Sequence, residues 1–334
     1  MGYLHMMNCL HVGGIKVSAV ADRSKKALNR AKSIGVHNLF SDYEELMRHS
    51  NSLDAVVISL PNFLHSKSIK LALEAGLDVF VEKPLAITPR ECYEIVKEVE
   101  KSGRKLMVGH CMRFMEAVEK LRKSISRGYA GELEVITIEE VLNGPFSHGR
   151  IPVPVPEWWF NPDKTGGGAL IDLGYHWIDL FRYFAGSQET RVLYSYLDHR
   201  LNLPVEDTAI AILESPSNHV TGMIHVGWYQ KSVFPQYNFR LIVHGSAGYL
   251  SSEDLVPKNL YLHAAKEGTK NLLRRIVGKK IRPLSYTYYY EAYYKEIKHF
   301  FECLKKDLNP SVPAVEGLKT IELVHEAYKL AKRD

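Results

Sequence analysis

The first third of the chain alternates apolar segments with amphipathic ones, and this alternation restricts the fold more than any other feature of the sequence. Four short segments are rich in apolar residues: 15–22, 53–61, 77–84 and 104–110. Amphipathic segments lie between them, at 24–35, 65–76 and 88–103. Nearly continuous apolar strands are typical of a parallel sheet that is buried on both faces. The order therefore predicts an α/β, Rossmann-like, doubly wound parallel sheet with right-handed crossovers.

Helix boundary signals support this assignment. Thr88 is a suitable N-cap, Pro89 fits the first helical position, and Gly103 follows the predicted end of the same helix. Gly35 and Gly76 stand where the two earlier helices are expected to stop.

Polar residues follow the predicted strands at their carboxyl ends, the edge where such sheets bind ligands. Asp22 ends the first strand, and an acid in this place commonly binds the ribose hydroxyls of NAD. Taken singly, Asp22 is equally a helix cap, Asn62 a turn residue and Lys83 a surface lysine. Their joint placement favours a cofactor edge. The candidate cofactor-binding residues are Gly2, Asp22, Arg23, Pro61, Asn62, His65, Glu82, Lys83 and Arg113.

The sequence begins with MGYLHMMNCLHVGG. A dinucleotide fold is expected to begin with a strand and GxGxxG, whose glycines let the backbone approach the pyrophosphate. Only Gly2 stands where the third glycine belongs, and Gly13 and Gly14 are typical of the end of the same helix. We therefore expect that an upstream extension of roughly ten residues would supply the strand and GxG, which the encoding DNA can test.

The second half has a different pattern. Short strands with turns between them predict an open, mostly antiparallel sheet, and the chain closes with two amphipathic helices, at 288–306 and 315–332. The tyrosines of segment 286–294 favour packing or an interface over base stacking, because basic residues are not interleaved with them. We expect a Rossmann domain over residues 1–115 and an α+β domain for substrate binding and oligomerisation over residues 116–334.

The stretch GGGALIDLGYHWIDLF, residues 166–181, predicts a turn that opens a helix. At about 100° per residue, Asp172, His176 and Asp179 fall within roughly 60° of one another. Apolar residues flank this polar face, so the three side chains need partners or a function. The simpler interpretation is an Asp–His hydrogen bond inside the core. A third partner from elsewhere in the chain would favour a catalytic site.

Composition limits the partners. Charged residues are 24% of the chain and the net charge is +5, with Lys and Arg scattered, so we expect no nucleic-acid partner. The four cysteines lie far apart without metal-binding spacing, which predicts no metal site and a reducing, cytoplasmic setting. No apolar run is long enough to span a bilayer, and no signal-peptide pattern is present, so we expect no membrane partner.

The chain resembles the glucose–fructose oxidoreductase / inositol dehydrogenase (Gfo/Idh/MocA) family through nearly its whole length. EKP alone is weak evidence, but EKP after a buried strand, followed about eighty residues later by GGGxxxDxGxHxxD, is a strong combination. The matching segments are AVADRS, ISLPNFLHSKSIKLALEAG, VFVEKPLA, VGHCMRF, GGGALIDLGYHWIDL, VEDTAIAIL and PAVEGLKTIELVHEAY.

The resemblance implies an NAD(P)-dependent dehydrogenase that acts on sugars, polyols or nucleotide sugars. It carries the lysine of EKP onto Lys83 and the motif aspartate and histidine onto Asp172 and His176. His176 would remove the hydroxyl proton, Lys83 would stabilise the developing alkoxide, and Asp172 would orient the imidazole or bind a hydroxyl. Asp179 is then structural. Nearby Trp158, Trp159 and Asn143 are candidates for a sugar pocket.

Several alternatives stay open. The substrate is a free polyol or sugar, or a nucleotide sugar, and a catalytically idle NAD(P)-binding regulator is a different class. Asp22 favours NAD over NADP by about tenfold or less, since Arg23 softens the repulsion of a 2′-phosphate. An exposed sheet face predicts a homodimer, or a homotetramer of two dimers, although the alternation puts some of its residues on the helix-covered side. The competing expectation is a monomer in which the segment after Gly248 folds back over the sheet. The residues expected to alternate along that face or near its end are Tyr194, Tyr196, Ile210, Ile212, Ile224, Val226, Trp228 and Tyr229.

Overall fold

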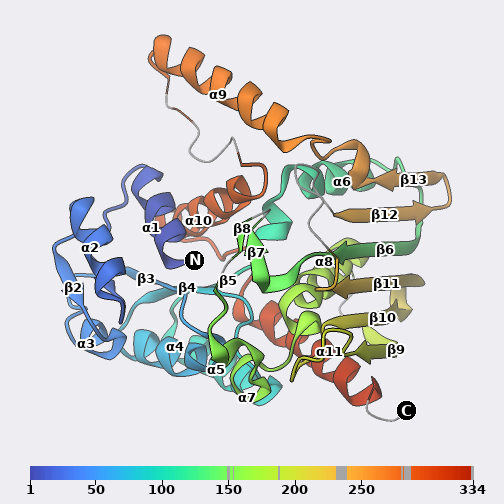
Figure 1. Cartoon of the computed structure of the whole chain (residues 1–334), viewed down its shortest axis with the longest axis horizontal. Coiled ribbons are helices and arrows are strands. Elements are labelled where there is room, and N and C mark those ends of the chain that lie inside the picture. Colours follow the sequence, from blue (N-terminus) through green and yellow to red (C-terminus); the bar gives the residue numbers. More distant parts are fainter. Residues whose placement is uncertain are drawn as a thin grey trace. The chain divides into compact units, whose positions relative to one another are not determined.

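The structure, a computed structural model, describes residues 1–148, 151–152, 154–186, 189–230, 239–279, 281 and 287–331. The chain forms two compact units. Unit 1 comprises residues 1–110 and 293–318, and unit 2 comprises residues 111–292 and 319–334. The elements of both are labelled in Figure 1.

The strands of unit 1 are parallel, as the sequence predicts, but they form two ladders. One pairs β1 (Ala19–Ala21) with β2 (Asn38–Phe40). The other has the order β3 (Ala55–Ile58), β4 (Asp78–Glu82) and β5 (Leu106–Gly109). Val79, Phe80 and Val81 of β4 are fully buried, as expected for a strand covered on both faces. Within the described ranges, no ladder joins β1 or β2 to β3.

The helices of unit 1 begin and end where local chemistry directs. The side chain of Thr88 accepts a hydrogen bond from the amide of Glu91, and the side chain of Glu91 accepts one from the amide of Thr88. This capping box begins the helix at residues 89–102. Gly103 ends it in the left-handed conformation at φ 65°. The helical elements are α1 (Gly2–His11), α2 (Lys25–Ser33), α3 (Tyr43–Arg48), η1 (Asn62–Leu64), α4 (His65–Glu74), α5 (Pro89–Ser102) and α10 (Tyr290–Lys305).

Unit 1 also includes residues 293–318, which the two predicted ranges assign to the second domain. The amide of Val108 in β5 donates to the carbonyl of Val312 at 2.9 Å. A Cβ built on Gly317, near the start of α11 (Ala314–Ala331), would lie 2.9 Å from Cβ of Leu85. The chain therefore returns to the parallel sheet before it ends, and glycine permits the close approach.

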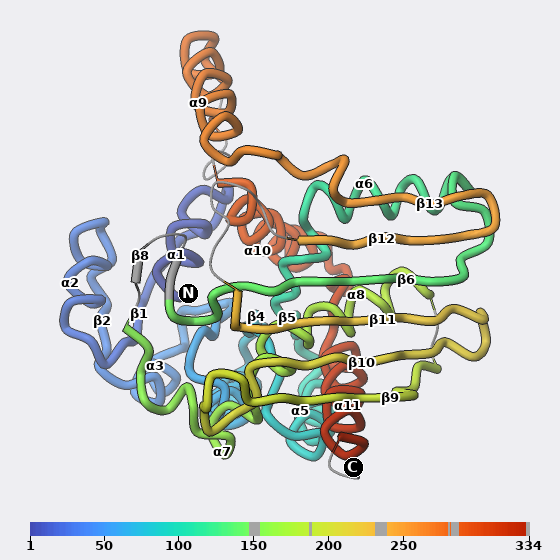
Figure 2. Tube along the Cα trace, turned by 45° about the vertical axis from the view of Figure 1, so that its right-hand side comes forward, coloured from blue at the N-terminus to red at the C-terminus, as the bar shows by residue number. Residues whose placement is uncertain are grey.

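Unit 2 is built on a six-stranded sheet whose strands Figure 2 shows side by side. Its order is β13-β12-β6-β11-β10-β9, and every neighbouring pair is antiparallel except β6 and β11. A parallel pair needs a long crossover, and the segment between these two strands, which includes α8, supplies it. The strands are β6 (Leu133–Val141), β9 (Arg191–Asp198), β10 (Thr208–Ser215), β11 (Val220–Gly227), β12 (Arg240–Gly245) and β13 (Gly248–Ser251).

The remaining elements of unit 2 surround this sheet. β7 (Ser147–His148) and β8 (Ile151–Pro152) form a small antiparallel pair. The helices are η2 (Cys111–Phe114), α6 (Glu116–Ser126), η3 (Gly144–Phe146), η4 (Glu157–Phe160), α7 (Pro162–Thr165), η5 (Leu170–Gly174), α8 (Tyr175–Ala185), η6 (Pro216–Asn218), η7 (Ser252–Asp254) and α9 (Leu260–Ile276).

One face of the sheet is covered by α8. A Cβ on Gly222 of β11 would lie 2.5 Å from the ring of Phe181, so only glycine lets the helix pack this closely. Ile224 and Val226 are fully buried here, so they are among the residues that the alternation places on the helix-covered side. Tyr194 and Tyr196 are 45% and 42% exposed on the other face, as expected from the alternation of side chains.

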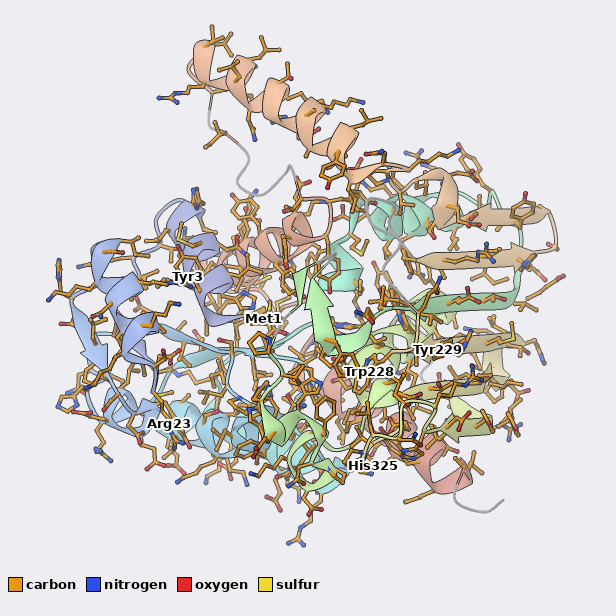
Figure 3. The ribbon with its side chains drawn as sticks, in the orientation of Figure 1. Met1, Tyr3, Arg23, Trp228, Tyr229 and His325 are labelled. Carbon is orange, nitrogen blue, oxygen red and sulfur yellow. The ribbon has the colours of Figure 1, made fainter. Side chains whose placement is uncertain are left out.

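The two aromatic residues after β11 differ. Trp228, labelled in Figure 3, is buried in a cluster with Ala169 and Val205, so it needs no further cover. Tyr229 is half-buried and hydrogen-bonds His225 at 2.7 Å. In the tyrosine segment, the buried Tyr288 accepts from the amide of Ala117, which confirms a packing role. Tyr286 lies outside the described residues.

Candidate functional site

Gly2 opens α1 beside the end of β3. A Cβ on this residue would lie 2.9 Å from the hydroxyl oxygen of Ser59, so a larger side chain would meet the segment that follows β3. Within the described structure, the first turn of α1 receives no side-chain cap. Its amides can therefore serve an anionic group, as helix N-termini do for phosphates.

Asp22 follows β1 and is exposed. Its carboxylate accepts from the amide of Ser24 at 2.7 Å, which fixes the turn into α2. Arg23 is also exposed, at the rim of unit 1 in Figure 3. An acid held by its own turn beside a strand end fits the ribose of a dinucleotide, and the glycine at α1 fits its pyrophosphate. The residues present in unit 1 therefore fit NAD.

Pro61, Asn62 and His65 follow β3. Asn62 begins η1, with Pro61 before it, and both are half-buried. His65 is fully buried, and its ring nitrogens lie 2.7 Å from the carbonyl oxygen of Pro84 and 2.9 Å from that of Leu60. Burial lowers the pKa of His65. The imidazole thus ties the turn after β3 to the turn after β4, and its predicted contact with a cofactor stays a prediction.

Glu82, at the end of β4, belongs to a buried group that the sequence did not predict. His5 from α1 lies 2.5 Å from its carboxylate, and Glu296 from α10 lies close by, with one donor atom of each of the three within 4.8 Å of the others. All three side chains are buried. Neither oxygen of Glu296 has a hydrogen-bond partner among the described residues.

The charges of this group follow from its burial. Desolvation and the neighbouring negative charge of Glu82 hold the pKa of Glu296 well above its usual range. Desolvation also acts to raise the pKa of Glu82, but the hydrogen bond and charge of His5 outweigh it and lower that pKa. Burial and a like charge therefore favour the protonated form of Glu296, whereas the neighbouring His5 favours the ionised form of Glu82. Lys83, next along the chain, is half-buried, and its amide lies 3.3 Å from the Glu82 carboxylate.

In unit 2, the GGG turn is held by a buried carboxylate from between β9 and β10. Glu206 accepts from the amides of Gly168 and Leu170 at 2.9 and 3.0 Å. It also accepts from the hydroxyl of Tyr328 in α11 at 2.7 Å. The chain packs too closely here for side chains: a Cβ on Gly168 would lie 1.9 Å from the carbonyl oxygen of Glu206, and one on Gly167 would lie 1.9 Å from the Tyr328 hydroxyl.

The turn leads into a π-helical segment, η5, which carries Asp172. The amide of Asp172 donates to the carbonyl of Gly168, and α8 then continues with His176, which is buried. The π-helical turn changes the angle between the two side chains from that of a regular α-helix. Such segments are frequent at functional sites. Both residues thus lie on the helical start that Glu206 holds.

The rest of α8 is fixed by long-range contacts. Arg113 donates two hydrogen bonds to Asp179, at 2.7 and 2.6 Å, and both side chains are buried. This pair confirms a structural role for Asp179. It also occupies the guanidinium of Arg113, whose predicted contact with a cofactor stays a prediction. Trp177 donates to Glu140 of β6 at 3.1 Å and stacks on Phe239 at 4.7 Å.

An aromatic group lies beside the GGG turn, as the sequence suggests. Trp158 and Trp159 have ring centroids 5.3 Å apart, and Trp159 packs against the cluster that contains Ala169 and Trp228. Phe146 and Phe160 stack at 5.9 Å in the same neighbourhood. This cluster supports the loop from outside, and the pocket role predicted for the tryptophans and Asn143 is not tested by it.

The structure places the predicted residues in two groups. Gly2, Asp22, Arg23, Pro61, Asn62, His65, Glu82 and Lys83 belong to unit 1, and Arg113, Asp172 and His176 belong to unit 2. Sequence reasoning missed His5, Glu296, Glu206 and Tyr328 as functional supports. The acid of VEDT, Glu206, is a recognisable signal, because an acid in an apolar strand region needs partners.

Comparison with known proteins assigns both units to one family. Residues 1–110 match a family model described as "Oxidoreductase family, NAD-binding Rossmann fold", and residues 118–251 match the "GFO/IDH/MocA C-terminal domain". Among the described residues, no helix is long and apolar enough to cross a membrane.

Individual relatives agree over nearly the full length. The chain is 28% identical over 317 residues to trans-1,2-dihydrobenzene-1,2-diol dehydrogenase of Bos taurus, with 94% of this chain and 88% of the relative covered. It is 24% identical over 334 residues to myo-inositol 2-dehydrogenase of Thermotoga maritima, covering 98% and 92%. The solved structure of scyllo-inositol dehydrogenase from Lactobacillus casei with NAD(H) and scyllo-inositol has a TM-score of 0.79 at 20% identity, covering 99% and 94%. This last likeness establishes the shared fold.

Proposed function

Because the chain belongs to the Gfo/Idh/MocA oxidoreductase family, we propose that it is an NAD(P)-dependent dehydrogenase acting on a secondary hydroxyl of a sugar, a polyol or a nucleotide sugar. Unit 1 holds the cofactor, and unit 2 supplies the substrate residues. The observation that carries the proposal is the start of the motif helix, where Glu206 fixes the turn that presents Asp172 and His176.

The cofactor is NAD, which, when bound, accepts the hydride of the alcohol. Gly2 and the first amides of α1 would hold its pyrophosphate, and Asp22 would bind its adenosine ribose. His176 takes the hydroxyl proton at a ring nitrogen, since a neutral imidazole is a suitable base near neutral pH. Lys83 stabilises the negative charge that develops on the substrate oxygen. Asp172 orients the imidazole or binds a neighbouring hydroxyl.

Relatives named as inositol and dihydrodiol dehydrogenases favour a cyclic vicinal diol as the substrate class. Nucleotide sugars remain the second candidate substrate class. The presence of Lys83, Asp172 and His176 in one chain argues against an idle regulator. None of the dehydrogenase relatives named above supports that alternative.

A cofactor-linked substrate screen tests this function. The purified chain is incubated with NAD or NADP and with inositols, free sugars, cyclic diols or nucleotide sugars, and reduced cofactor is followed by absorbance. We expect turnover of at least one class and its loss in His176→Asn. His219→Asn is the matched control, since His219 is exposed and has φ 55°, which Asn tolerates. Unchanged turnover in His176→Asn would contradict the assigned base.

Lys83 and His176 are proposed to serve the same reaction, which a double-mutant cycle tests. If both act on one transition state, then combining Lys83→Met with His176→Asn costs less than the product of the two single losses. Independent, multiplicative losses would contradict a shared role.

We further propose a homodimer or homotetramer joined through the exposed face of the mixed sheet, and a cytoplasmic setting. Tyr194, Tyr196 and Met223 are 42–45% exposed on that face, which leaves apolar surface for a partner. All four cysteines are buried, and none forms a disulfide in the described structure, which suits a reducing compartment. Light scattering at micromolar concentration tests the assembly: a mass near the 38.0 kDa of one chain would contradict it.

A further inference from the structure

The helix α9 presents its apolar side to solvent. Figures 1 and 2 show it, in orange, extending away from the strands of unit 2. At about 100° per residue, Leu262, Leu272, Leu273 and Ile276 fall within roughly 100° of one another on one side of the helix. Their side chains are 71%, 59%, 57% and 70% exposed. Val277, directly after the helix, is 64% exposed.

The opposite side of α9 is polar and less exposed. Glu267, on the opposite side, is buried and pairs with Lys270. His263 meets the ring of the buried Tyr288 edge-on, with centroids 5.6 Å apart. This orientation is the reverse of that of an ordinary surface helix, which buries its apolar stripe. We define the apolar stripe of α9 as Leu262, Leu272, Leu273 and Ile276.

Positive charge borders this stripe on both sides. Lys266 and Lys270 flank it on one side and Arg275 on the other, and all three are exposed. Residues 258–279 hold six Lys or Arg and one Glu, a surplus of five positive charges. That surplus equals the net charge of the whole chain, so the other 312 residues contain 37 residues of each sign. The positive charge of the protein is therefore concentrated at α9.

We propose that α9 docks on the surface of an anionic lipid bilayer, with its apolar stripe in the headgroup region and its basic residues on lipid phosphates. An exposed apolar stripe bordered by Lys and Arg is the pattern of a helix that lies in the membrane interface. Basic residues near such a surface each contribute to binding through the negative potential of the lipids. This docking is independent of the dehydrogenase reaction and uses none of its residues.

Charge decides between a bilayer and a second copy of the chain. Two α9 helices packed through their apolar stripes would bring Lys266, Lys270 and Arg275 of each copy against the same residues of the other, which is unfavourable. An anionic lipid surface neutralises both borders at once. The expectation of no membrane partner rested on the absence of an apolar run long enough to span a bilayer and of a signal-peptide pattern. Neither signal reports on a helix that lies in the membrane interface.

Vesicle sedimentation tests the docking with the full chain. Wild-type protein is mixed with vesicles of phosphatidylcholine alone or of phosphatidylcholine with 30% phosphatidylglycerol, at about 0.1 M salt, where the Debye length is about 10 Å. We expect binding to the anionic vesicles and little to the neutral ones. Wild-type protein that stays in the supernatant with anionic vesicles would overturn the proposal.

Matched variants separate α9 from general electrostatic attraction. Replacing Lys266, Lys270 and Arg275 with Gln should weaken binding on the order of 100-fold, from about fivefold per residue. Replacing Lys97, Lys101 and Lys123 with Gln changes the net charge equally at exposed positions elsewhere and should leave binding within about threefold. Equal losses in the two triple variants would overturn the proposal.

The apolar stripe needs its own test. Leu272→Glu with Ile276→Glu should abolish sedimentation, whereas Leu308→Glu, at a 54% exposed leucine of unit 1, should not. These side chains are exposed, so thermal unfolding should show all variants folded. Light scattering of the same proteins excludes the other occupant. A fall in mass in the α9 variants alone would show that a second copy covers the stripe and would overturn the lipid assignment.

Discussion

The cofactor edge of unit 1 and the motif helix of unit 2 are built in different ways. At the cofactor edge, functional side chains follow strands directly and are held by near neighbours, as Asp22 is by Ser24. At the motif helix, the support comes from Glu206 and Tyr328, which are distant in sequence. A buried glutamate serves each region. Glu206 accepts hydrogen bonds from three groups, whereas Glu296 has none among the described residues.

The number of hydrogen-bond donors around each side chain explains why the buried Glu206 and Glu296 have different roles. Burial raises the pKa of both, but hydrogen bonds from Tyr328, Leu170 and Gly168 oppose the rise for Glu206. Glu206 is therefore a clamp on backbone amides. In Glu296, burial beside the carboxylate of Glu82 favours the protonated form. Glu82 directly precedes Lys83, the lysine of EKP.

The largest effect is expected from the base on the motif helix. His176→Asn should lower kcat on the order of 10²–10⁴-fold, the usual contribution of a general base, with the binding of NAD unchanged. Steady-state kinetics and a direct NAD titration measure the two. If NAD binding falls as much as kcat, His176 contributes to cofactor binding. That result would contradict the assignment of cofactor binding to unit 1 and of the catalytic base to unit 2.

The clamp should have the next largest effect. Glu206→Ala leaves the amides of Gly168 and Leu170 buried without an acceptor, so unfolding free energy should fall by about 1–3 kcal/mol. A displaced His176 should also lower kcat by up to about 100-fold. Glu206→Gln keeps an amide oxygen as acceptor and should restore most of kcat. If both variants lose kcat equally with unchanged KM and no rescue, the charge of Glu206 acts directly and the clamp is contradicted.

Cofactor preference tests the edge of unit 1. Wild-type protein should prefer NAD over NADP by about tenfold or less, equivalent to about 1.4 kcal/mol, because Asp22 repels a 2′-phosphate. Asp22→Asn should reduce or invert this ratio, since it removes the charge and keeps an acceptor for the Ser24 amide. Titration of both cofactors measures it. Tighter binding of NADP by the wild type would contradict the role of Asp22.

The smallest effect concerns the proton on Glu296. Folding raises the pKa of the Glu296 carboxyl group. Its protonated form therefore stabilises the fold fully below the ordinary carboxyl pKa, and this stabilisation is lost as the pH rises through the folded-state pKa. Glu296→Gln should flatten the fall of the unfolding free energy that occurs as the pH rises above the ordinary carboxyl range. Denaturation curves from pH 5 to 9 measure this, with Glu302→Gln, exposed on the same helix, as control.

The opposite sign applies to Glu82. Its folded pKa is lowered, so its stabilising contribution is present above the ordinary carboxyl range and is lost as the pH falls through the folded value. Acid sensitivity should therefore persist in Glu296→Gln. The same three side chains, with His5, have a spacing that can also hold a metal ion. If a chelator lowers the stability of the wild type but not that of Glu296→Gln, the three side chains bind a metal ion, and the interpretation of Glu296 as a protonated group is contradicted.

Much of unit 1 follows from local sequence rules. Thr88, Pro89 and Gly103 bound a helix through signals within a few residues, and the buried apolar runs specify parallel strands. The parallel pairing of β6 with β11 was not predictable, because it depends on a crossover rather than on either strand. The hydrogen bond between Glu206 and Tyr328 was not predictable either, because the two residues are distant in sequence and meet only in the folded chain.

The orientation of α9 shows the remaining limit. No helix was predicted from the sequence over residues 260–276, which form α9 in the structure. Burial of the apolar side is the ordinary expectation for a surface helix, but the structure exposes it. Helical periodicity can mark an apolar side, but it does not show which side contacts the protein.

The transfer of hydrogen from a ring carbon to NAD tests the central claim most directly. Wild-type protein is incubated with NAD and with the best substrate of the screen deuterated at its ring carbons, starting from the inositols, and the reduced cofactor is analysed by mass spectrometry. The account predicts reduced cofactor that carries one deuterium in the wild type and in His219→Asn, formed on the order of 10²–10⁴-fold more slowly by His176→Asn. Absence of reduced cofactor with every sugar, polyol and nucleotide sugar, or reduced cofactor without deuterium, would contradict it.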